Sequence, residues 1–429
     1  MKLTFRNLGL ASVFLSLAVC TPAIAGEISL LTEALPPDKD ASYRCSAIEA
    51  LASAKDDFAG KEIAGLLSDT DQTVRACAIR ALRGAGAGKN DAAAEALLAE
   101  VDNYQAASSI KGLYENNIKA RLRAIDSVWA LGEIGDPRLM PKLAEFYTGA
   151  DDVIKINLIV SMGKLEKNEK SGPFLYSIAA DPRETEVVRA AAFEMLEHIG
   201  SPAAVPGLAP SQNIGMEKGD LIFTGGIVGT ISGWVSPDMP VGHSGIFAGT
   251  ETRDGRIRVL IADCVPSFFV PGDVRNIDSW HKFTRQYEFP FYGNRTSKVR
   301  PTPAQRDRIV KRALAMGKLG LKYKLFRKGP LKYDCVNYTE FLYEEAGLNP
   351  TPDSYESGAG WPFTPWEQFE ATSPAAPVPG PLRLPKVGMS IAPDPGIIAR
   401  GIGSLTGAFG MKSAQASEVN IDIQPEAVN

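Results

Sequence analysis

The chain has 429 residues, of which 45% are hydrophobic, and 46 basic residues against 50 acidic ones leave a net charge of −4. This near balance leaves no electrostatic footprint for a nucleic-acid partner. The length exceeds what one hydrophobic core normally organises, so we expect two domains and additional terminal segments.

The first 25 residues have the pattern of a secretory signal peptide. Lys2 and Arg6 precede an apolar run over 8–19, and Ala-Ile-Ala stands at 23–25, immediately before Gly26. The run is shorter than the roughly 18 residues of a transmembrane helix, and Pro, Gly or charge interrupts every later apolar stretch. Lipidation at Cys20 is disfavoured because Val19 is bulky. We expect an exported protein, periplasmic or secreted, with no transmembrane segment and a linker over 26–42.

Residues 43–210 are predicted to be entirely helical, because Ala and Leu recur there at helical spacing. The stretches ALRGAG, ALGEIG and MLEHIG each place Leu in one register and close on a Gly suited to the left-handed position after a helix. With a degenerate unit at 153–165 the period is roughly 32 residues, a spacing at which helix pairs stack into a solenoid. This part resembles HEAT-like repeats, which implies a structural role or a docking surface for a protein partner.

Two of the four cysteines in the mature chain, Cys45 and Cys77, fall on predicted neighbouring helices. An oxidising compartment would allow them to form a disulfide, which stabilises a fold by about 3–4 kcal/mol for a loop of this length. Two small buried side chains explain the same pattern. The sequence leaves both interpretations open.

Beyond residue 212 the composition changes to short strands separated by Gly, Pro and Asp. GDLIFTGG, HSGIFAG and RIRVLIADC read as strands, Thr302 and Pro303 open one helix, and a helix that starts beside Cys335 ends at Gly347. A short helix closes the domain within 363–371. We therefore predict an α+β domain with a small antiparallel sheet over 214–371, followed by a disordered Pro/Gly/Ala-rich tail over 372–429.

Cys335 has the features of a nucleophile. It stands in the first turn of its helix, where backbone N–H groups and the helix dipole favour a thiolate. His243 opens a strand among small residues and is the best candidate base. Alternation along the next strand aligns Asp263 as a group that orients the imidazole, although a slip of one residue would place Ala262 or Cys264 there. On spacing alone, a buried cysteine with an unrelated histidine is the favoured interpretation, and a catalytic pair is the alternative.

The stretches GDLIF, VGHSGIFAG, VLIADC and YDCVNYTEFLYEEAGL, in this order, resemble circularly permuted papain-fold hydrolases of the YiiX type. Those proteins are relatives of the NlpC-type cell-wall peptidases and, more distantly, of the lecithin–retinol acyltransferases. The match covers residues 219–371, and the order of histidine before cysteine points to the permuted branch. The resemblance implies Cys335 as nucleophile, His243 as base and Asp263 at a polar position often held by Glu. It implies a cysteine hydrolase that works through an acyl-thioester without a cofactor.

Rival chemistries fit the sequence less well. A serine-hydrolase elbow would need Gly where Ile246 stands, and three dispersed histidines do not form a zinc site. Export and kinship with cell-wall peptidases favour a peptidoglycan amide as substrate, whereas the lipid-processing relatives favour a fatty-acyl ester or amide. A non-catalytic periplasmic binding protein is a third interpretation. A basic run leads into the nucleophile; it is either a solvated loop, which the composition favours, or a surface that attracts carboxylates or phosphate headgroups. It consists of Lys318, Lys322, Lys324, Arg327, Lys328 and Lys332.

Removal of the signal peptide should place the mature N-terminus at or next to Gly26, because the apolar run ends on the cleavage site. Intact-mass measurement of the exported protein checks this. An acylated Cys20 at the N-terminus would contradict it.

Overall fold

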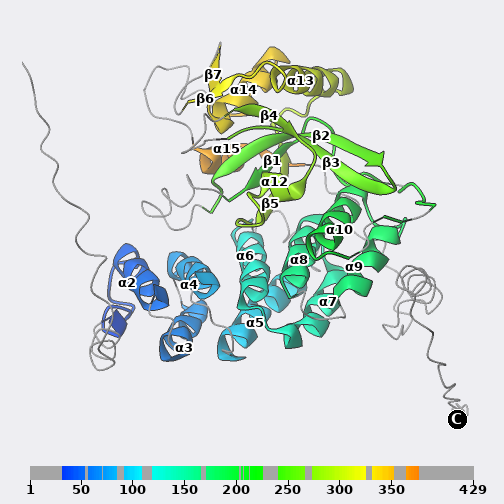
Figure 1. The fold of residues 1–429 in the computed structure, drawn as a ribbon. Helices are drawn as coiled ribbons and strands as arrows, with labels where there is room; N and C mark the ends of the chain where they lie inside the picture. The colour runs from blue at the N-terminus through cyan, green and yellow to red at the C-terminus, as the bar shows by residue number, and fades with distance from the viewer. Residues whose placement is uncertain are drawn as a thin grey trace, which may run out of the picture. The chain divides into compact units, whose positions relative to one another are not determined.

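A computed structural model describes residues 31–53, 57–69, 71–84, 91–108, 118–165, 171–201, 204–205, 207–211, 213–225, 240–265, 273–324, 331–351 and 364–375. The predicted signal peptide and the predicted tail beyond residue 375 lie outside these ranges. The described residues form a mixed α+β structure, with helices first and a small antiparallel sheet after them (Figure 1). None of their helices is both long enough and apolar enough to cross a bilayer.

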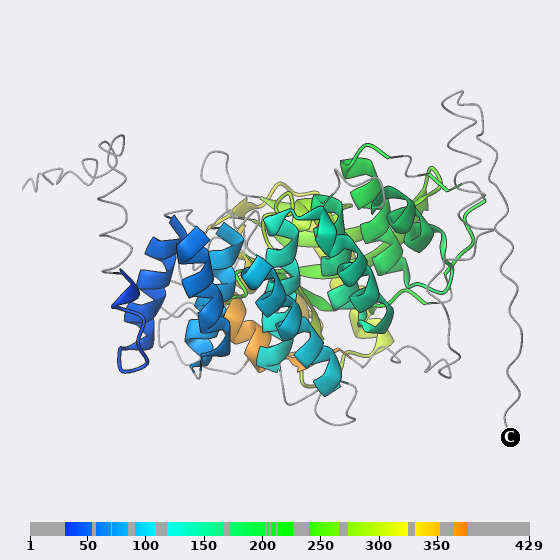
Figure 2. The same ribbon diagram turned by 90° about the horizontal axis from the view of Figure 1, so that it is seen from below.

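The first part of the chain is helical throughout its described ranges. Helices α2, α4, α6, α8 and α10 each contact the next member of that series, and Figure 2 shows the helices following one another from blue to green. Gly135 and Gly200 have φ of 69° and 71°, as predicted for glycines that end helices. The bounds are α2 Ala41–Ser53, α3 Asp57–Gly65, η1 Leu66–Ser68, α4 Gln72–Gly84, α5 Asp91–Ser108, α6 Ile118–Ile134, η2 Pro137–Leu139, α7 Met140–Gly149, α8 Asp152–Lys164, α9 Ser171–Ala180 and α10 Glu186–His198.

Helix α2 is fixed at its start by covalent and polar contacts. Cys45 and Cys77 form a disulfide between α2 and α4, which decides the alternative that the sequence left open. The predicted linker also differs from the structure, because Ala34 and Leu35 are buried and the Leu35 carbonyl accepts a hydrogen bond from Arg44 Nε at 2.7 Å. These apolar residues cover the end of the helical stack and do not act as a spacer.

The second part of the chain contains a six-stranded sheet in the order β4-β3-β2-β1-β5-β8, with neighbouring strands antiparallel. The sequence predicts three of these strands, β1, β2 and β3; it does not predict β4, β5 and β8. A separate ribbon pairs β6 with β7 in parallel. The bounds are β1 Leu221–Thr224, β2 His243–Arg253, β3 Arg256–Cys264, β4 Val274–Ile277, β5 Phe291–Thr296, β6 Lys322–Tyr323, β7 Lys332–Tyr333 and β8 Ser373–Pro374.

Four helices accompany the sheet: α12 Trp280–Phe283, α13 Pro303–Met316, α14 Cys335–Glu345 and α15 Pro365–Ala371. Thr302 forms the predicted N-cap of α13 within a capping box, and Pro303 follows at the first helical position. In Figure 1, α13 and α14 lie on one side of the sheet, with α8 and α10 on the other. The predicted start of the tail at 372 falls inside the ordered structure, because Ser373 and Pro374 pair with β5.

Buried polar side chains join the helices to the sheet. Asn157 in α8 pairs with the backbone of Phe291 in β5: its Nδ2 donates to the carbonyl at 2.7 Å and its Oδ1 accepts from the N–H at 3.0 Å. Glu194 in α10 accepts from Ser279 Oγ, Trp280 N and His281 N at 2.9–3.0 Å. Burial raises the pKa of Glu194 to about 7, and these three hydrogen bonds oppose that rise. The sheet therefore depends on polar groups that the helices supply.

Glu194→Ala should lower the free energy of unfolding by about 3 kcal/mol or more, because two buried backbone N–H groups and a hydroxyl lose their acceptor. Urea denaturation monitored by tryptophan fluorescence measures the change. The matched control is Glu197→Ala on the same helix, which removes a partly exposed pair with Arg256 and Arg258 and should cost about 1 kcal/mol or less. Equal effects of the two substitutions would contradict the role of Glu194.

Candidate functional site

Cys335 is the first residue of α14, as predicted, and it is buried. Asp334 caps the helix by accepting from Asn337 N at 2.8 Å, and Asn337 Nδ2 donates back to the same carboxylate at 2.7 Å. The cap and the amide fix the first turn, so the position of the sulfur is set by the backbone. In the structure Cys335 and Cys264 are both free thiols.

Asp263 lies in β3 and is completely buried, with each carboxylate oxygen occupied. His243 Nε2 is 3.2 Å from Oδ2, and Arg275 donates Nε to Oδ1 at 2.8 Å and NH2 to Oδ2 at 3.0 Å. The strand register explains the arrangement, because Asp263 stands opposite Gly245 in β2 and opposite Arg275 in β4. His243 is diagonal to Asp263, on the same face of the sheet. The predicted pairing of His243 with Asp263 is therefore present.

Gly245 leaves the space in which these side chains meet. A Cβ at this position would stand 3.0 Å from the Phe283 ring and 3.3 Å from Asp263 Cβ. The Phe283 ring lies 5.4 Å from the His243 ring, centroid to centroid, so the imidazole has an apolar wall on one side and a carboxylate on another. A side chain at 245 would push these groups apart.

The Asp263 carboxylate determines which nitrogen of the neutral His243 ring carries the proton. An ionised carboxylate only accepts hydrogen bonds, so its partner Nε2 carries the proton in the neutral ring. Hydrogen bonding from His243 and the charge of Arg275 hold the pKa of Asp263 below its usual value, even though burial, the largest effect, acts to raise it. Nδ1 is consequently the nitrogen of His243 that is available to accept a proton.

Cys335 approaches the same strand from another direction. The backbone N–H of Ser244 hydrogen-bonds to its sulfur, whereas no hydrogen bond joins Cys335 to the His243 ring within the described part of the chain. Cys264 points to the face opposite Asp263 and donates its Sγ to the Tyr333 carbonyl at 3.3 Å. The segment leading into Cys335 thus packs on that opposite face. His243 is the first residue of β2. For the two residues to act as a dyad, its ring must reach the Cys335 thiol around the end of that strand.

The thiol of Cys335 is not pre-ionised, contrary to the expectation from its place at a helix start. Burial raises the pKa of Cys335 to about 12, and the adjacent charge of Asp334 contributes in the same direction. Backbone N–H groups, including that of Ser244, oppose the rise. The carboxylate that caps the helix offsets the positive end of the dipole, which is why the first-turn position alone does not produce a thiolate.

Two residues at this site have no recognisable signal in the sequence. Arg275 lies on a four-residue strand that periodicity does not reveal, and its role depends on pairing with Asp263. Tyr323 in β6 has a buried hydroxyl without a hydrogen-bond partner among the described residues. Burial raises the pKa of Tyr323, as do the charges of Cys335, Asp334 and Cys264, so its hydroxyl lies near the thiol. This hydroxyl is a donor available to a bound molecule.

The other two histidines lie elsewhere. His198 ends α10, and its ring is 5.7 Å from that of His281, which lies in the short helix α12. Both line a cavity of about 400 Å³ whose lining does not include Cys335 or His243. Among the described residues the partners of the Asp263 side chain are His243 and Arg275, so His243 stays the candidate base.

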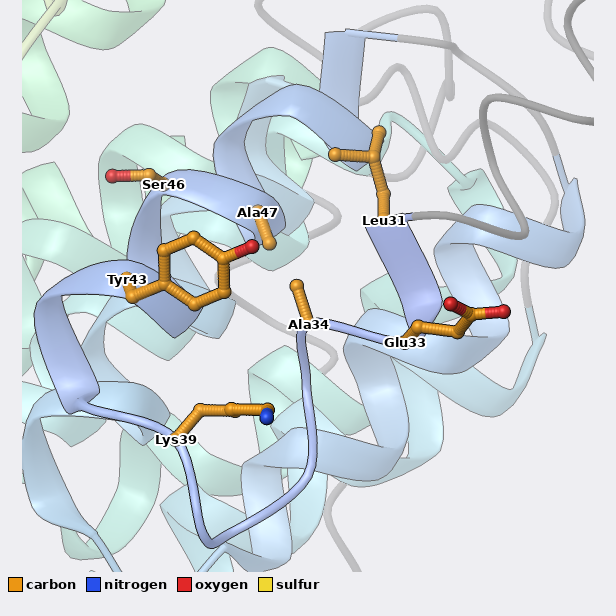
Figure 3. Close-up of a pocket in the computed structure, with 7 residues that line it drawn as sticks. All are labelled: Leu31, Glu33, Ala34, Lys39, Tyr43, Ser46 and Ala47. Carbon is orange, nitrogen blue, oxygen red and sulfur yellow. The ribbon is translucent and has the colours of Figure 1, made fainter.

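A second pocket, of about 680 Å³, lies at the start of the helical part (Figure 3). Figure 3 shows the residues around it, which are Leu31, Glu33, Ala34, Lys39, Tyr43, Ser46 and Ala47. The lining lacks a nucleophile paired with a base. Among the described residues there is also no cluster of three His, Cys, Asp or Glu side chains arranged to bind a metal ion.

Comparison with known proteins adds no family. No family model matches the chain, and a search of curated proteins by sequence finds no match. The resemblance to YiiX-type hydrolases therefore rests on the sequence stretches between residues 219 and 371.

Alkylation of Cys335 by iodoacetamide should be slow at neutral pH and should accelerate with increasing pH without a plateau up to about pH 10, because the reagent attacks the thiolate. Peptide mapping by mass spectrometry after timed exposure measures the rate, and the urea-unfolded protein provides the reference for an accessible cysteine. Alkylation of the native protein at pH 7 as fast as the unfolded reference would contradict a raised pKa.

Proposed function

We propose that the protein is an exported cysteine hydrolase in which Cys335 attacks an acyl carbonyl, His243 transfers the proton and Asp263 orients the imidazole. The observation that carries the proposal is the buried Asp263–His243 contact of 3.2 Å beside a strand residue whose N–H bonds to the Cys335 sulfur. A buried carboxylate that fixes the tautomer of a histidine, with a free thiol beside the next residue of the same strand, supplies the three groups that nucleophilic catalysis uses.

The proposed architecture is a HEAT-like solenoid followed by a permuted papain-like domain. Sequential contacts along α2, α4, α6, α8 and α10 support the first element, since stacked repeats contact mainly their neighbours. A helix beginning at the cysteine, packed against strands β2 and β3 that hold the histidine and the carboxylate, supports the second. The Cys45–Cys77 disulfide is compatible with export to an oxidising compartment.

The chemistry follows from the neutral thiol. Attack of Sγ on the carbonyl carbon must be coupled to transfer of the thiol proton to His243 Nδ1, because a free thiolate is scarce at a pKa of about 12. Asp263 stabilises the imidazolium that results. This proton then moves to the leaving amine or alkoxide, and water cleaves the acyl-thioester, releasing the acid and restoring the thiol. The backbone N–H of Cys335 is a suitable donor to the oxyanion.

The proposal sets a geometric requirement on the bound state. His243 Nδ1 must come within hydrogen-bond distance of Cys335 Sγ when substrate is present, a tightening common in enzymes whose free form has longer catalytic contacts. If the ring stays on the face of Asp263, the His243–Asp263–Arg275 cluster is structural and the binding-protein interpretation applies.

A peptidoglycan amide, in a stem peptide or a crosslink, is the substrate class that we favour from the resemblance to cell-wall peptidases. A fatty-acyl ester or amide is the second candidate, and one observation supports it: exposed leucines and lysines lie together on the ribbon that leads into Cys335. Incubation with purified sacculi and with phospholipid vesicles, followed by mass spectrometry of the products, separates the two.

On whichever substrate is turned over, Cys335→Ala should abolish activity and His243→Ala should reduce kcat by at least about 10²-fold, the scale of a lost general base. Asp263→Ala should cost less, because an orienting group is partly replaceable. Initial rates with saturating substrate measure these effects.

Cys264→Ala is the matched control, since it removes the other buried free thiol and should retain most of the activity. Thermal unfolding verifies that each variant is folded. Retained activity in folded Cys335→Ala protein would refute the mechanism.

A further inference from the structure

The β6–β7 ribbon turns charged side chains outward and aromatic side chains inward. In its parallel register Lys322 stands opposite Lys332, and Tyr323 stands opposite Tyr333. The lysines are exposed, whereas Tyr333 is buried and Tyr323 is partly buried. Side chains alternate between the two faces of a strand, so the lysines share the outward face of the ribbon and give it a positive charge.

The charge on this face is poorly compensated. Lys322 forms an ion pair with Asp273 at 2.6 Å, but Lys318, Lys324 and Lys332 have no ion-pair partner within the described ranges. Like charges directly opposite each other in a sheet destabilise it. The repulsion between the two opposed lysines is weaker where a negatively charged partner approaches the surface.

Two large apolar side chains lie among these lysines. Leu319, in the turn after α13, is 64% exposed, and Leu331, immediately before β7, is 65% exposed. The Leu331 carbonyl accepts a hydrogen bond from Lys322 N at 3.2 Å, so this leucine is adjacent to the ribbon. A single exposed leucine needs no explanation. Two of them flanked by unpaired lysines combine the two attractions that bind a peripheral protein to a bilayer.

We propose that this surface binds the interface of a bilayer that contains anionic lipids. The ribbon surface, as we call it, consists of Lys318, Leu319, Lys322, Lys324, Leu331 and Lys332. The lysines would contact phosphate headgroups, while the leucines would enter the boundary between headgroups and acyl chains. A polysaccharide or a soluble acidic peptide satisfies the charges alone and leaves the leucines in water, which is why a lipid surface fits better.

The ribbon surface is close to the candidate nucleophile along the chain. Lys332 is followed by Tyr333, Asp334 and Cys335, and Tyr323 of the ribbon lies near the thiol (Figure 1). Bound in this way, the protein would hold its candidate site near the membrane surface. The inference goes beyond the proposed function and is independent of it, since lipid binding needs neither thiol nor imidazole.

The test is co-sedimentation of the full mature chain with lipid vesicles. The vesicles contain phosphatidylcholine alone or phosphatidylcholine with about 30% phosphatidylglycerol, which gives a negative surface potential. Binding should require phosphatidylglycerol and should weaken as salt is raised from about 0.05 M to 0.5 M, because screening shortens the range of the attraction. The double variants K324E/K332E and L319S/L331S should each weaken binding by about tenfold or more.

Matched controls carry the same substitutions elsewhere on the surface. Lys61→Glu, on α3, and Val299→Ser, at a residue 72% exposed, should bind vesicles as the unchanged protein does. Cys335→Ala should also bind fully, which separates failure of this inference from failure of the proposed catalysis. No binding to anionic vesicles, or equal binding by the ribbon variants and controls with all of them folded by circular dichroism, would overturn the proposal.

Discussion

The buried carboxylate of Asp263 is the interaction on which the candidate site depends. It is fully removed from solvent and would be costly without partners, and Arg275 and His243 together occupy its oxygens. This requirement fixes the register of β2, β3 and β4, because a shift of one residue would move the Asp263 side chain to the opposite face of the sheet. It also holds the His243 ring, whose Nε2 lies 3.2 Å from Asp263 Oδ2. Stability and proposed chemistry thus rest on one group.

The helical part contributes to this site through α12. Glu194 holds the backbone of Trp280 and His281, and the same short helix places the Phe283 ring against His243. The Lys282 carbonyl accepts from Arg275 at 3.3 Å, so α12 also supports the partner of Asp263. The helical part is therefore more than a separate docking module: its buried glutamate helps to orient the groups around the imidazole.

Sequence patterns predicted the parts of the site that depend on residues close together in the chain. The helical pattern that ends at Gly347 placed Cys335 at the start of α14, and alternation along β3 selected Asp263. Arg275 and Tyr323 lie on strands too short to show periodicity, and Glu194 lies on a predicted helix but acts through backbone groups of α12, so none of the three was predicted. The thiol pKa was misjudged because burial and the charge of the capping carboxylate outweigh the helix dipole, and neither is visible without tertiary structure.

The central claim is that Cys335 carries the acyl group during turnover. Its most direct test is to quench the reaction in acid at early times, digest the protein, and examine the peptide that contains Cys335 by mass spectrometry. The account predicts a substrate-dependent mass increase on Cys335 that hydroxylamine removes, as expected for a thioester, and that is strongly reduced in His243→Ala. Turnover without any adduct on Cys335, and with an acyl group trapped on another side chain, would contradict it.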